Sequence, residues 1–175
     1  KQYKASETQH IPEMEQLIEW LPNNIPPGDK TTIVHGDYRL DNMVLHPTEP
    51  RVIAVLDWEL CTLGDPLADF SYHLMNWVMP PGDSSRGSIM AIDDLKAWGI
   101  PTMDEYVDLY CKHTGRDGLP ELDYYFAYNG FRLAGILQGI IGRVRDGTAN
   151  SANAESNAAR VVPLAKFAAE YARRA

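Results

Sequence analysis

The chain has 175 residues, of which 45% are apolar and 23% charged, and its formal net charge is -8. This composition is ordinary for a globular protein with one sizeable core, while the acidic balance argues against nucleic-acid binding, which requires a basic surface. Because no apolar run approaches the ~20 residues of a membrane span, and because two cysteines are too few for a disulfide framework, we expect a soluble protein of the reduced cytoplasm.

The first part of the chain predicts one helix and then short strands. Apolar residues recur at helical spacing over residues 11–21, and Pro22 is expected to end this helix. Three short β-prone runs follow, at residues 31–34, 42–46 and 52–56. Turn residues separate the second run from the third, so these two runs predict a hairpin with Asp57 at its exit.

The segment after Asp57 predicts only helices and loops. Asp65 is placed to cap the N-terminus of a helix, and Pro66 fits the first turn of that helix. Apolar residues continue at helical spacing to Trp77, and a polar loop is expected at residues 80–88. The aromatic side chains of this region are expected in the core: Trp58, Phe70, Tyr72 and Trp77.

The remaining sequence predicts three helices. Thr102 and Glu105 have the spacing of a capping box, so a helix is expected to begin there and to end at Gly115. Residues 122–145 form a long stretch rich in apolar side chains, which predicts a helix buried on more than one side. A last helix is expected over residues 154–172.

The candidate chemistry is concentrated in residues 35–42. His35, Asp37 and Asn42 form the pattern H-x-D-x-x-x-x-N between two predicted strands. A carboxylate at Asp37 can orient an attacking hydroxyl group and accept its proton, and oxygen ligands from Asn42 and Asp57 suit Mg²⁺. These groups meet the main needs of phosphoryl transfer, which are positioning and charge neutralisation. Asp57 follows four apolar residues, so its expected burial would require a partner or a metal.

Three motifs carry a resemblance to a known family. They are Val34-His35-Gly36-Asp37 with Asn42, Val55-Leu56-Asp57-Trp58-Glu59, and Gly64-Asp65-Pro66-Leu67-Ala68-Asp69. Together they resemble the aminoglycoside phosphotransferase and choline kinase superfamily, and residues 56–66 are also similar to the kinase-like domains fused to acyl-CoA dehydrogenases. The resemblance implies an α+β, mostly helical fold: the C-terminal lobe of a protein-kinase-like enzyme, with a small β-hairpin carrying the catalytic loop at residues 35–42.

The resemblance also implies roles for individual residues in an ATP-dependent phosphotransferase. Asp37 matches the catalytic base that orients the acceptor hydroxyl group. Asn42 and Asp57 match the ligands of the Mg²⁺ that accompanies ATP, the co-substrate. Arg39 lies two residues after the base, where protein kinases often place a lysine that contacts the γ-phosphate. Glu59 is a further candidate, which either reaches the metal through water or is simply solvated.

Three other residues are expected to support the loop rather than to take part in the chemistry. His35 is interpreted as a buried histidine that braces the loop, and Asp65 as a helix cap. Asp69 is interpreted as a helix carboxylate that holds the backbone of the catalytic loop, as in similar folds.

An N-terminal nucleotide-binding lobe is implied by the family but is not visible in this sequence. The residues before His35 contain no Gly-rich loop and no strand lysine. We therefore expect residues 1–175 to form a single domain, the C-terminal lobe of a longer parent protein, with a helical remainder over residues 65–175. The expected partners are the missing lobe and a small-molecule hydroxyl acceptor. A surface left apolar by the missing lobe could also promote self-association.

Two other functions and several acceptors stay open at this point. The chain could be a non-catalytic kinase-like binding module, or a hydrolase that holds a transition metal with His35, Asp37 and Asp57. No second histidine lies at ligand spacing from His35, which argues against the hydrolase. The acceptor could resemble an aminoglycoside, choline or a hydroxyacyl compound, and the acidic net charge favours a cation.

Overall fold

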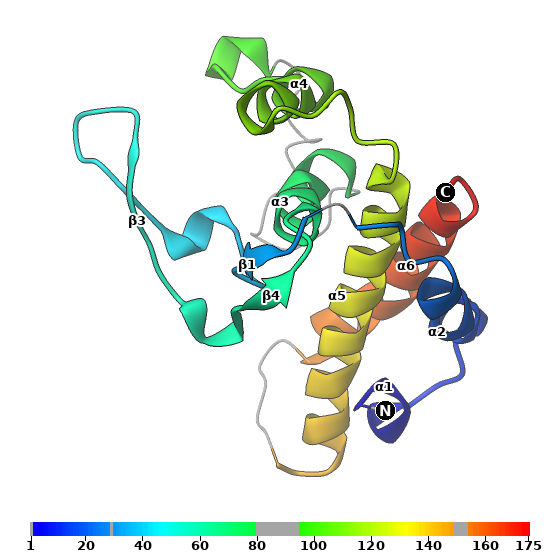
Figure 1. The fold of residues 1–175 in the computed structure, drawn as a ribbon. Coiled ribbons are helices and arrows are strands. Elements are labelled where there is room, and N and C mark those ends of the chain that lie inside the picture. Colours follow the sequence, from blue (N-terminus) through cyan, green and yellow to red (C-terminus); the bar gives the residue numbers. More distant parts are fainter. Residues whose placement is uncertain (1, 29, 80–94, 149–153) are drawn as a thin grey trace. The chain divides into compact units, whose positions relative to one another are not determined.

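The computed structural model describes residues 2–28, 30–79, 95–148 and 154–175 (Figure 1). These residues form two compact units. The helical unit contains residues 2–26, 120–148 and 154–175, and the loop unit contains residues 27–28, 30–79 and 95–119. The predicted polar loop at residues 80–88 lies outside the described residues.

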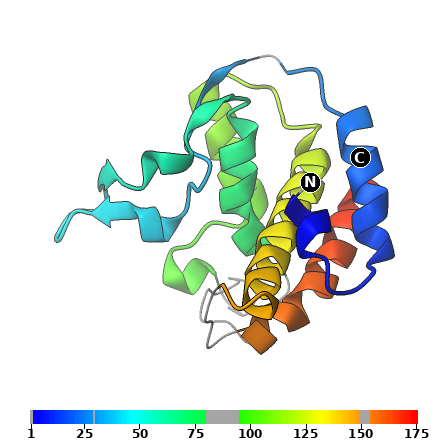
Figure 2. The ribbon, with the colours of Figure 1, turned by 90° about the horizontal axis from the view of Figure 1, so that it is seen from below.

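The helical unit is built on two long helices that run side by side, as Figures 1 and 2 both show. Its helices are α1 (Gln2–Ser6), α2 (Pro12–Asn23), α5 (Leu122–Arg145) and α6 (Ala154–Ala172). Helix α5 packs against α6, α1 and α2, which confirms the prediction that this helix is buried on more than one side. The predicted bounds of α5 and α6 are also confirmed.

Small residues let the helices of this unit approach closely. Leu17 and Leu21 of α2 are buried against Ala127 of α5 and against Ala168 and Ala169 of α6. Alanine brings little side-chain bulk to such an interface, so the leucine side chains fill the space between the backbones.

The N-terminal segment is tied to α5 by a close contact and by a buried amide. A Cβ atom at Gly142 would lie 2.7 Å from Cβ of Ser6, so only glycine fits there. Gln138 is buried, and its Nε2 donates hydrogen bonds to the carbonyl of Ser6 at 2.6 Å and to Oγ1 of Thr8 at 3.0 Å. Helix α1 was not expected from its polar sequence, and its position depends on these contacts with a distant helix.

Helix α2 continues past Pro22 to Asn23, so the prediction that Pro22 ends the helix is wrong by one residue. The last carbonyl groups of a helix have no N–H partner within the helix and need other donors. The side-chain amides of Asn23 and Asn24 donate to the carbonyls of Glu19 and Trp20, both at 2.8 Å. These two asparagines cap the helix beside the proline.

The loop unit contains two antiparallel strand pairs. Strand β2 (Met43–Leu45) pairs with β3 (Val52–Val55), which confirms the predicted hairpin. Strand β1 (Thr32–Val34) pairs with β4 (Thr62–Gly64), with Ile33 opposite Leu63. The prediction of only helix and loop after Asp57 is therefore wrong, because three residues are too few to show a strand period and β4 forms through its distant partner.

Two helices complete the loop unit: α3 (Leu67–Val78) and α4 (Met103–Thr114). The predicted capping box is confirmed, because Oγ1 of Thr102 accepts from the N–H of Glu105 and the Glu105 carboxylate accepts from the N–H of Thr102. Helix α4 ends at Gly115 in the left-handed conformation, as predicted. The rings of Phe70 on α3 and Tyr110 on α4 stack at 3.7 Å between centroids.

Exposed apolar side chains are concentrated in the strand region of the loop unit. Nine large apolar residues between positions 33 and 63 are exposed: Ile33, Leu40, Leu45, Val52, Ile53, Leu56, Trp58, Leu60 and Leu63. The prediction of a core position is wrong for Trp58, whose indole N–H instead donates to the carbonyl of Val55 at 2.8 Å. Phe70 is buried as predicted.

Both cysteines are free thiols, Cys61 exposed and Cys111 buried. Among the described residues, no helix combines the length and the apolar character that a bilayer crossing demands.

Candidate active site

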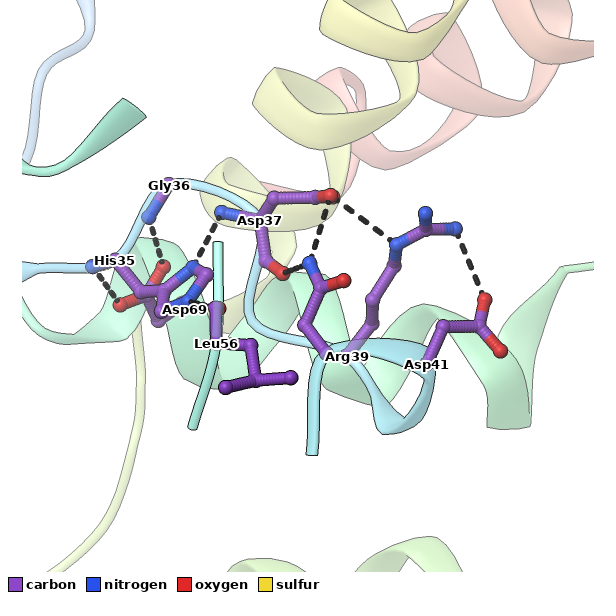
Figure 3. A network of polar contacts seen from close by, with 8 residues as sticks. His35, Gly36, Asp37, Arg39, Asp41, Leu56 and Asp69 are labelled. Atoms are coloured by element: carbon purple, nitrogen blue, oxygen red, sulfur yellow. Dashed lines mark hydrogen bonds and ion pairs between the residues drawn. The ribbon is translucent and has the colours of Figure 1, made fainter. Parts of the chain in front are cut away.

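The loop that connects β1 to β2 carries the predicted catalytic residues, and helix α3 fixes its start (Figure 3). The carboxylate of Asp69, in the first turn of α3, accepts hydrogen bonds from the backbone N–H groups of His35 at 2.6 Å and Gly36 at 2.9 Å. Gly36 has φ +84°, and a Cβ atom there would lie 2.7 Å from the carbonyl oxygen of Leu60. The turn after His35 therefore requires glycine.

His35 links the start of the loop to the end of strand β3. Its side chain is buried, and Nδ1 accepts a hydrogen bond from the N–H of Asp37 at 3.2 Å. The other nitrogen, Nε2, lies 2.7 Å from the carbonyl of Leu56. Because Nδ1 is an acceptor, the proton of the neutral ring belongs on Nε2, which donates to Leu56. Both ring nitrogens thus hold backbone groups, one just before Asp57 and one at Asp37 itself.

The carboxylate of Asp37 is held on one of its two oxygens. Oδ2 accepts from Nε of Arg39 at 3.1 Å and from Nδ2 of Asn42 at 3.0 Å. The same Asn42 amide donates to the backbone carbonyl of Asp37 at 2.9 Å. The Asp37 carboxylate has no other polar partner within the described ranges, so Oδ1 is available to a bound molecule.

Arg39 lies between two carboxylates of the same loop (Figure 3). Besides its bond to Asp37, it places NH1 3.1 Å from Oδ2 of Asp41. Arg39 is partly buried whereas the Asp41 side chain is 69% exposed, so solvent screens the Asp41 contact more strongly. Asp41 was not among the predicted site residues, and only its place two residues after Arg39 could have pointed to it.

The two candidate metal ligands are joined through the backbone. The N–H of Leu56 donates to the carbonyl of Asn42 at 2.8 Å, which continues the β2–β3 pairing up to the residue before Asp57. Asn42 is buried, and its amide nitrogen is engaged with Asp37, so its side-chain oxygen is the end available for a ligand. That oxygen and the Asp57 carboxylate have no polar partner in the described parts of the chain.

Asp57 departs from the expectation of a buried carboxylate, because it is exposed. Its backbone has φ 66° and ψ 50°, and it is the one residue other than glycine with positive φ in the described structure. Aspartate tolerates this left-handed conformation better than most residues, but it still costs of the order of 1 kcal/mol. The left-handed residue follows β3 and precedes a short 3-10 turn at Trp58–Leu60. An exposed carboxylate and a buried amide oxygen are both oxygen donors of the kind that Mg²⁺ prefers.

The remaining predicted site residues lie further from this network. Oδ1 of Asp65 accepts from the N–H of Leu67 at 2.8 Å, so Asp65 caps the start of α3. Glu59 is exposed on the 3-10 turn after Asp57 and, among the described residues, forms no hydrogen bond or ion pair with the loop.

The geometry argues against the alternative of a transition-metal hydrolase. Both nitrogens of His35 already hold backbone groups. In the described residues, the one group of three His, Cys, Asp or Glu side chains with ligand atoms within 4.8 Å of each other is Glu7, His10 and Glu15, in the helical unit. Lys4 already forms ion pairs with Glu7 and Glu15 there.

Comparison with known proteins places the chain in a family. A model of the phosphotransferase enzyme family (APH) matches residues 1–106. Acyl-CoA dehydrogenase family member 10 of Mus musculus is 43% identical over 173 residues, covering 98% of this chain and 16% of that protein. Acyl-CoA dehydrogenase family member 11 of Gallus gallus is 38% identical over 176 residues, covering 99% of this chain and 23% of that protein. The chain therefore spans less than a quarter of the length of these curated relatives.

A solved structure gives the same result. A protein of Ralstonia eutropha JMP134, provisionally designated an aminoglycoside phosphotransferase, superposes with a TM-score of 0.88 at 53% sequence identity. The match covers 99% of this chain and 52% of that chain. The predicted kinase-like fold and the resemblance to kinase-like domains in acyl-CoA dehydrogenase proteins are both confirmed, and the chain belongs to the phosphotransferase enzyme family (APH).

Proposed function

We propose that this chain is the catalytic lobe of an ATP-dependent phosphotransferase, which transfers the γ-phosphate to a hydroxyl group of a small molecule. The observation that carries the proposal is the arrangement of Asp37, Asn42 and the backbone before Asp57. One amide, that of Asn42, holds both the side chain and the backbone of Asp37, while the carbonyl of Asn42 binds the N–H of Leu56. Base and metal ligands are thus parts of one hydrogen-bonded unit.

Asp37 acts as the base through its outer oxygen. Because Arg39 and Asn42 both donate to Oδ2, the acceptor hydroxyl group bonds to Oδ1 and passes its proton there as its oxygen attacks the γ-phosphorus of ATP. The bond from that phosphorus to the bridging oxygen breaks, and ADP leaves. The two donors also hold the carboxylate in one rotamer, which keeps the hydroxyl group aligned for the transfer.

Asn42 and Asp57 would hold Mg²⁺, through the amide oxygen of the first and the carboxylate of the second. When bound, the ion neutralises charge on the phosphate oxygens and orients them for in-line transfer. Arg39 supplies a second positive charge beside the phosphate. Its Nε stays with Asp37 and its NH1 with Asp41, so NH2, which has no partner among the described residues, donates to a phosphate oxygen.

The rest of the enzyme is supplied by a longer parent protein. The chain matches about half of the solved relative and less than a quarter of the curated ones, which supports additional domains. The nine exposed apolar residues of the strand region are proposed to contact the lobe that carries the nucleotide base. The names of the relatives suggest two classes of acceptor, an acyl compound and an aminoglycoside.

Calorimetric titration of Mg·ATP and a phosphotransfer assay on the natural full-length protein test this function. Asp57→Ala is expected to abolish Mg·ATP binding. Asp37→Ala is expected to keep the binding and to lower turnover by roughly 10²–10⁴-fold, the contribution typical of a general base. Asp117→Ala, which removes an exposed carboxylate elsewhere in the loop unit, is the control and should change neither quantity. Equal loss of nucleotide binding in Asp37→Ala and Asp57→Ala would refute the separate roles.

A further inference from the structure

An aromatic cluster borders the catalytic loop within the loop unit. Tyr38 follows Asp37 directly, and its ring lies 6.1 Å from the ring of His73 on α3. His73 lies 5.8 Å from Trp77 and 5.6 Å from Tyr106 on α4, and Trp77 stacks on Tyr106 at 5.1 Å. These four residues, Tyr38, His73, Trp77 and Tyr106, are called the aromatic wall below. It joins the loop to both helices of the unit.

The wall differs from a packed core in two respects. All four side chains are only partly buried, whereas Phe70, next to them on α3, is buried. The wall also has a polar atom without a partner. Nδ1 of His73 is buried and has no hydrogen-bond partner among the described residues. The Tyr38 and Tyr106 hydroxyl groups are further hydrogen-bonding atoms of the wall. Core polar groups are normally paired, because an unpaired one costs free energy.

The wall itself carries no charged side chain at neutral pH. Burial lowers the pKa of His73 and raises that of Tyr106, and the nearby Tyr38 hydroxyl adds to the second effect. At neutral pH the wall therefore presents uncharged rings with hydrogen-bonding atoms at their edges. No salt bridge of the described structure involves any of its four residues.

Resting on the function proposed above, we propose that the aromatic wall binds the acceptor, with His73 and Tyr106 as the residues that determine specificity. An apolar surface with a few unpaired polar atoms is the usual form of a small-molecule site. Tyr38 directly follows Asp37, and its ring contacts His73, so the wall borders the loop that carries the base. The wall offers no carboxylate for an ammonium group, so the acceptor is an alcohol that is uncharged and mainly apolar around its reacting hydroxyl group, not a polyamine.

The test is a steady-state assay of the natural full-length protein with two probes, a medium-chain hydroxyacyl-CoA and kanamycin. The hydroxyacyl probe is expected to be the better acceptor. Tyr106→Phe keeps the ring and removes only the hydroxyl group, and it should raise KM for the acceptor by about 3–10-fold with KM for ATP unchanged. Tyr110→Phe is the matched control on the same helix. Its ring stacks on Phe70 and its hydroxyl group interacts with Arg116, so both KM values should stay the same.

His73→Leu separates a binding role from a structural one. If Nδ1 is kept unpaired for a ligand, its removal should raise the melting temperature by about 2–4 °C while raising KM for the acceptor. A residue that merely packs the helices would instead lower the melting temperature and leave KM unchanged. Turnover with unchanged acceptor KM in both Tyr106→Phe and His73→Leu would overturn the inference and leave the proposed function standing. A preference for kanamycin would also overturn it.

The inference can be judged even when phosphoryl transfer fails. If the protein binds Mg·ATP but phosphorylates neither probe, transfer to these two acceptors is excluded, and the role of the wall is then judged by calorimetric binding of the hydroxyacyl probe. Weaker binding of that probe to Tyr106→Phe than to the natural protein would support the wall as its site. Equal binding, or no binding, would overturn it.

Discussion

The carboxylate of Asp69 accepts a hydrogen bond from the backbone N–H of His35 at 2.6 Å, although 34 residues separate the two in the sequence. The second oxygen of the Asp69 carboxylate accepts a hydrogen bond from the N–H of Gly36 at 2.9 Å. One side chain in the first turn of α3 thereby fixes the backbone from which His35 and Asp37 project. The position of the base, Asp37, therefore depends on a helix that lies much later in the sequence.

Asp69→Asn should destabilise the protein by about 1–3 kcal/mol, because hydrogen bonds to a charged acceptor are worth that much and the new amide nitrogen would face an N–H group. Urea unfolding measures the change. The control is Asp65→Asn, since Asp65 accepts one N–H at the start of the same helix and asparagine caps about as well as aspartate. Equal losses in the two variants would contradict the special role of Asp69.

Gly36→Ala should cost more stability than Gly115→Ala. Both glycines have positive φ, +84° at Gly36 and +68° at Gly115, so alanine is strained in both places. A Cβ atom at Gly36 would also lie 2.7 Å from the carbonyl of Leu60, whereas at Gly115 it meets no atom within 4 Å. We expect about 1 kcal/mol for Gly115→Ala and roughly 2–4 kcal/mol for Gly36→Ala, measured by thermal unfolding. Similar losses would show that the loop moves away from Leu60 at little cost.

The left-handed backbone of Asp57 should lower the stability of the protein, whereas its carboxylate should be required for Mg·ATP binding. Asp57→Gly and Asp57→Ala both remove the carboxylate, so both should lose Mg·ATP binding under the proposed function. Glycine adopts φ 66° freely and alanine does not, so the glycine variant should be more stable than the alanine variant by about 1 kcal/mol. Chemical denaturation of the two variants side by side checks this difference, and an alanine variant of equal stability would argue against the strain.

Arg39→Met should affect turnover far more than stability. The ion pairs of Arg39 with Asp37 and Asp41 are partly solvated, so their contribution to stability stays below about 1 kcal/mol. Loss of a positive group beside the transferring phosphate should lower kcat by roughly 10–100-fold. Arg51→Met, which breaks an exposed ion pair with Glu49 on the hairpin turn, serves as the control. Full activity of Arg39→Met would remove Arg39 from the proposed mechanism.

The stability of the protein should fall in mild acid because of His73. Burial holds the pKa of His73 below its usual value of about 6.5. Between these two pKa values the unfolded chain binds more protons than the folded one, so stability declines as the pH falls below about 6.5, whereas above it His73 has no effect. The melting temperature of His73→Leu should therefore drop less than that of the natural protein between pH 8 and pH 5.5. Parallel curves for the two proteins would contradict this.

The sequence alone determined the elements whose signals are local. Helices α5 and α6 carry long periodic patterns, and the capping box and Gly115 mark the ends of α4 through contacts within one turn. The pattern H-x-D-x-x-x-x-N likewise identified the loop, because a motif of this kind requires fixed spacing between residues that act together.

Only the tertiary structure decided the features that depend on residues far apart. Strand β4 is defined by its pairing with β1, and α1 by its contact with Gly142 and Gln138. The exposure of Asp57, the choice of Oδ1 as the free oxygen of Asp37, and the meeting of Tyr38 with His73 follow from backbone geometry and from contacts across the loop unit. Such contacts have no period or spacing in the sequence, because their free energy arises only when the chain has folded.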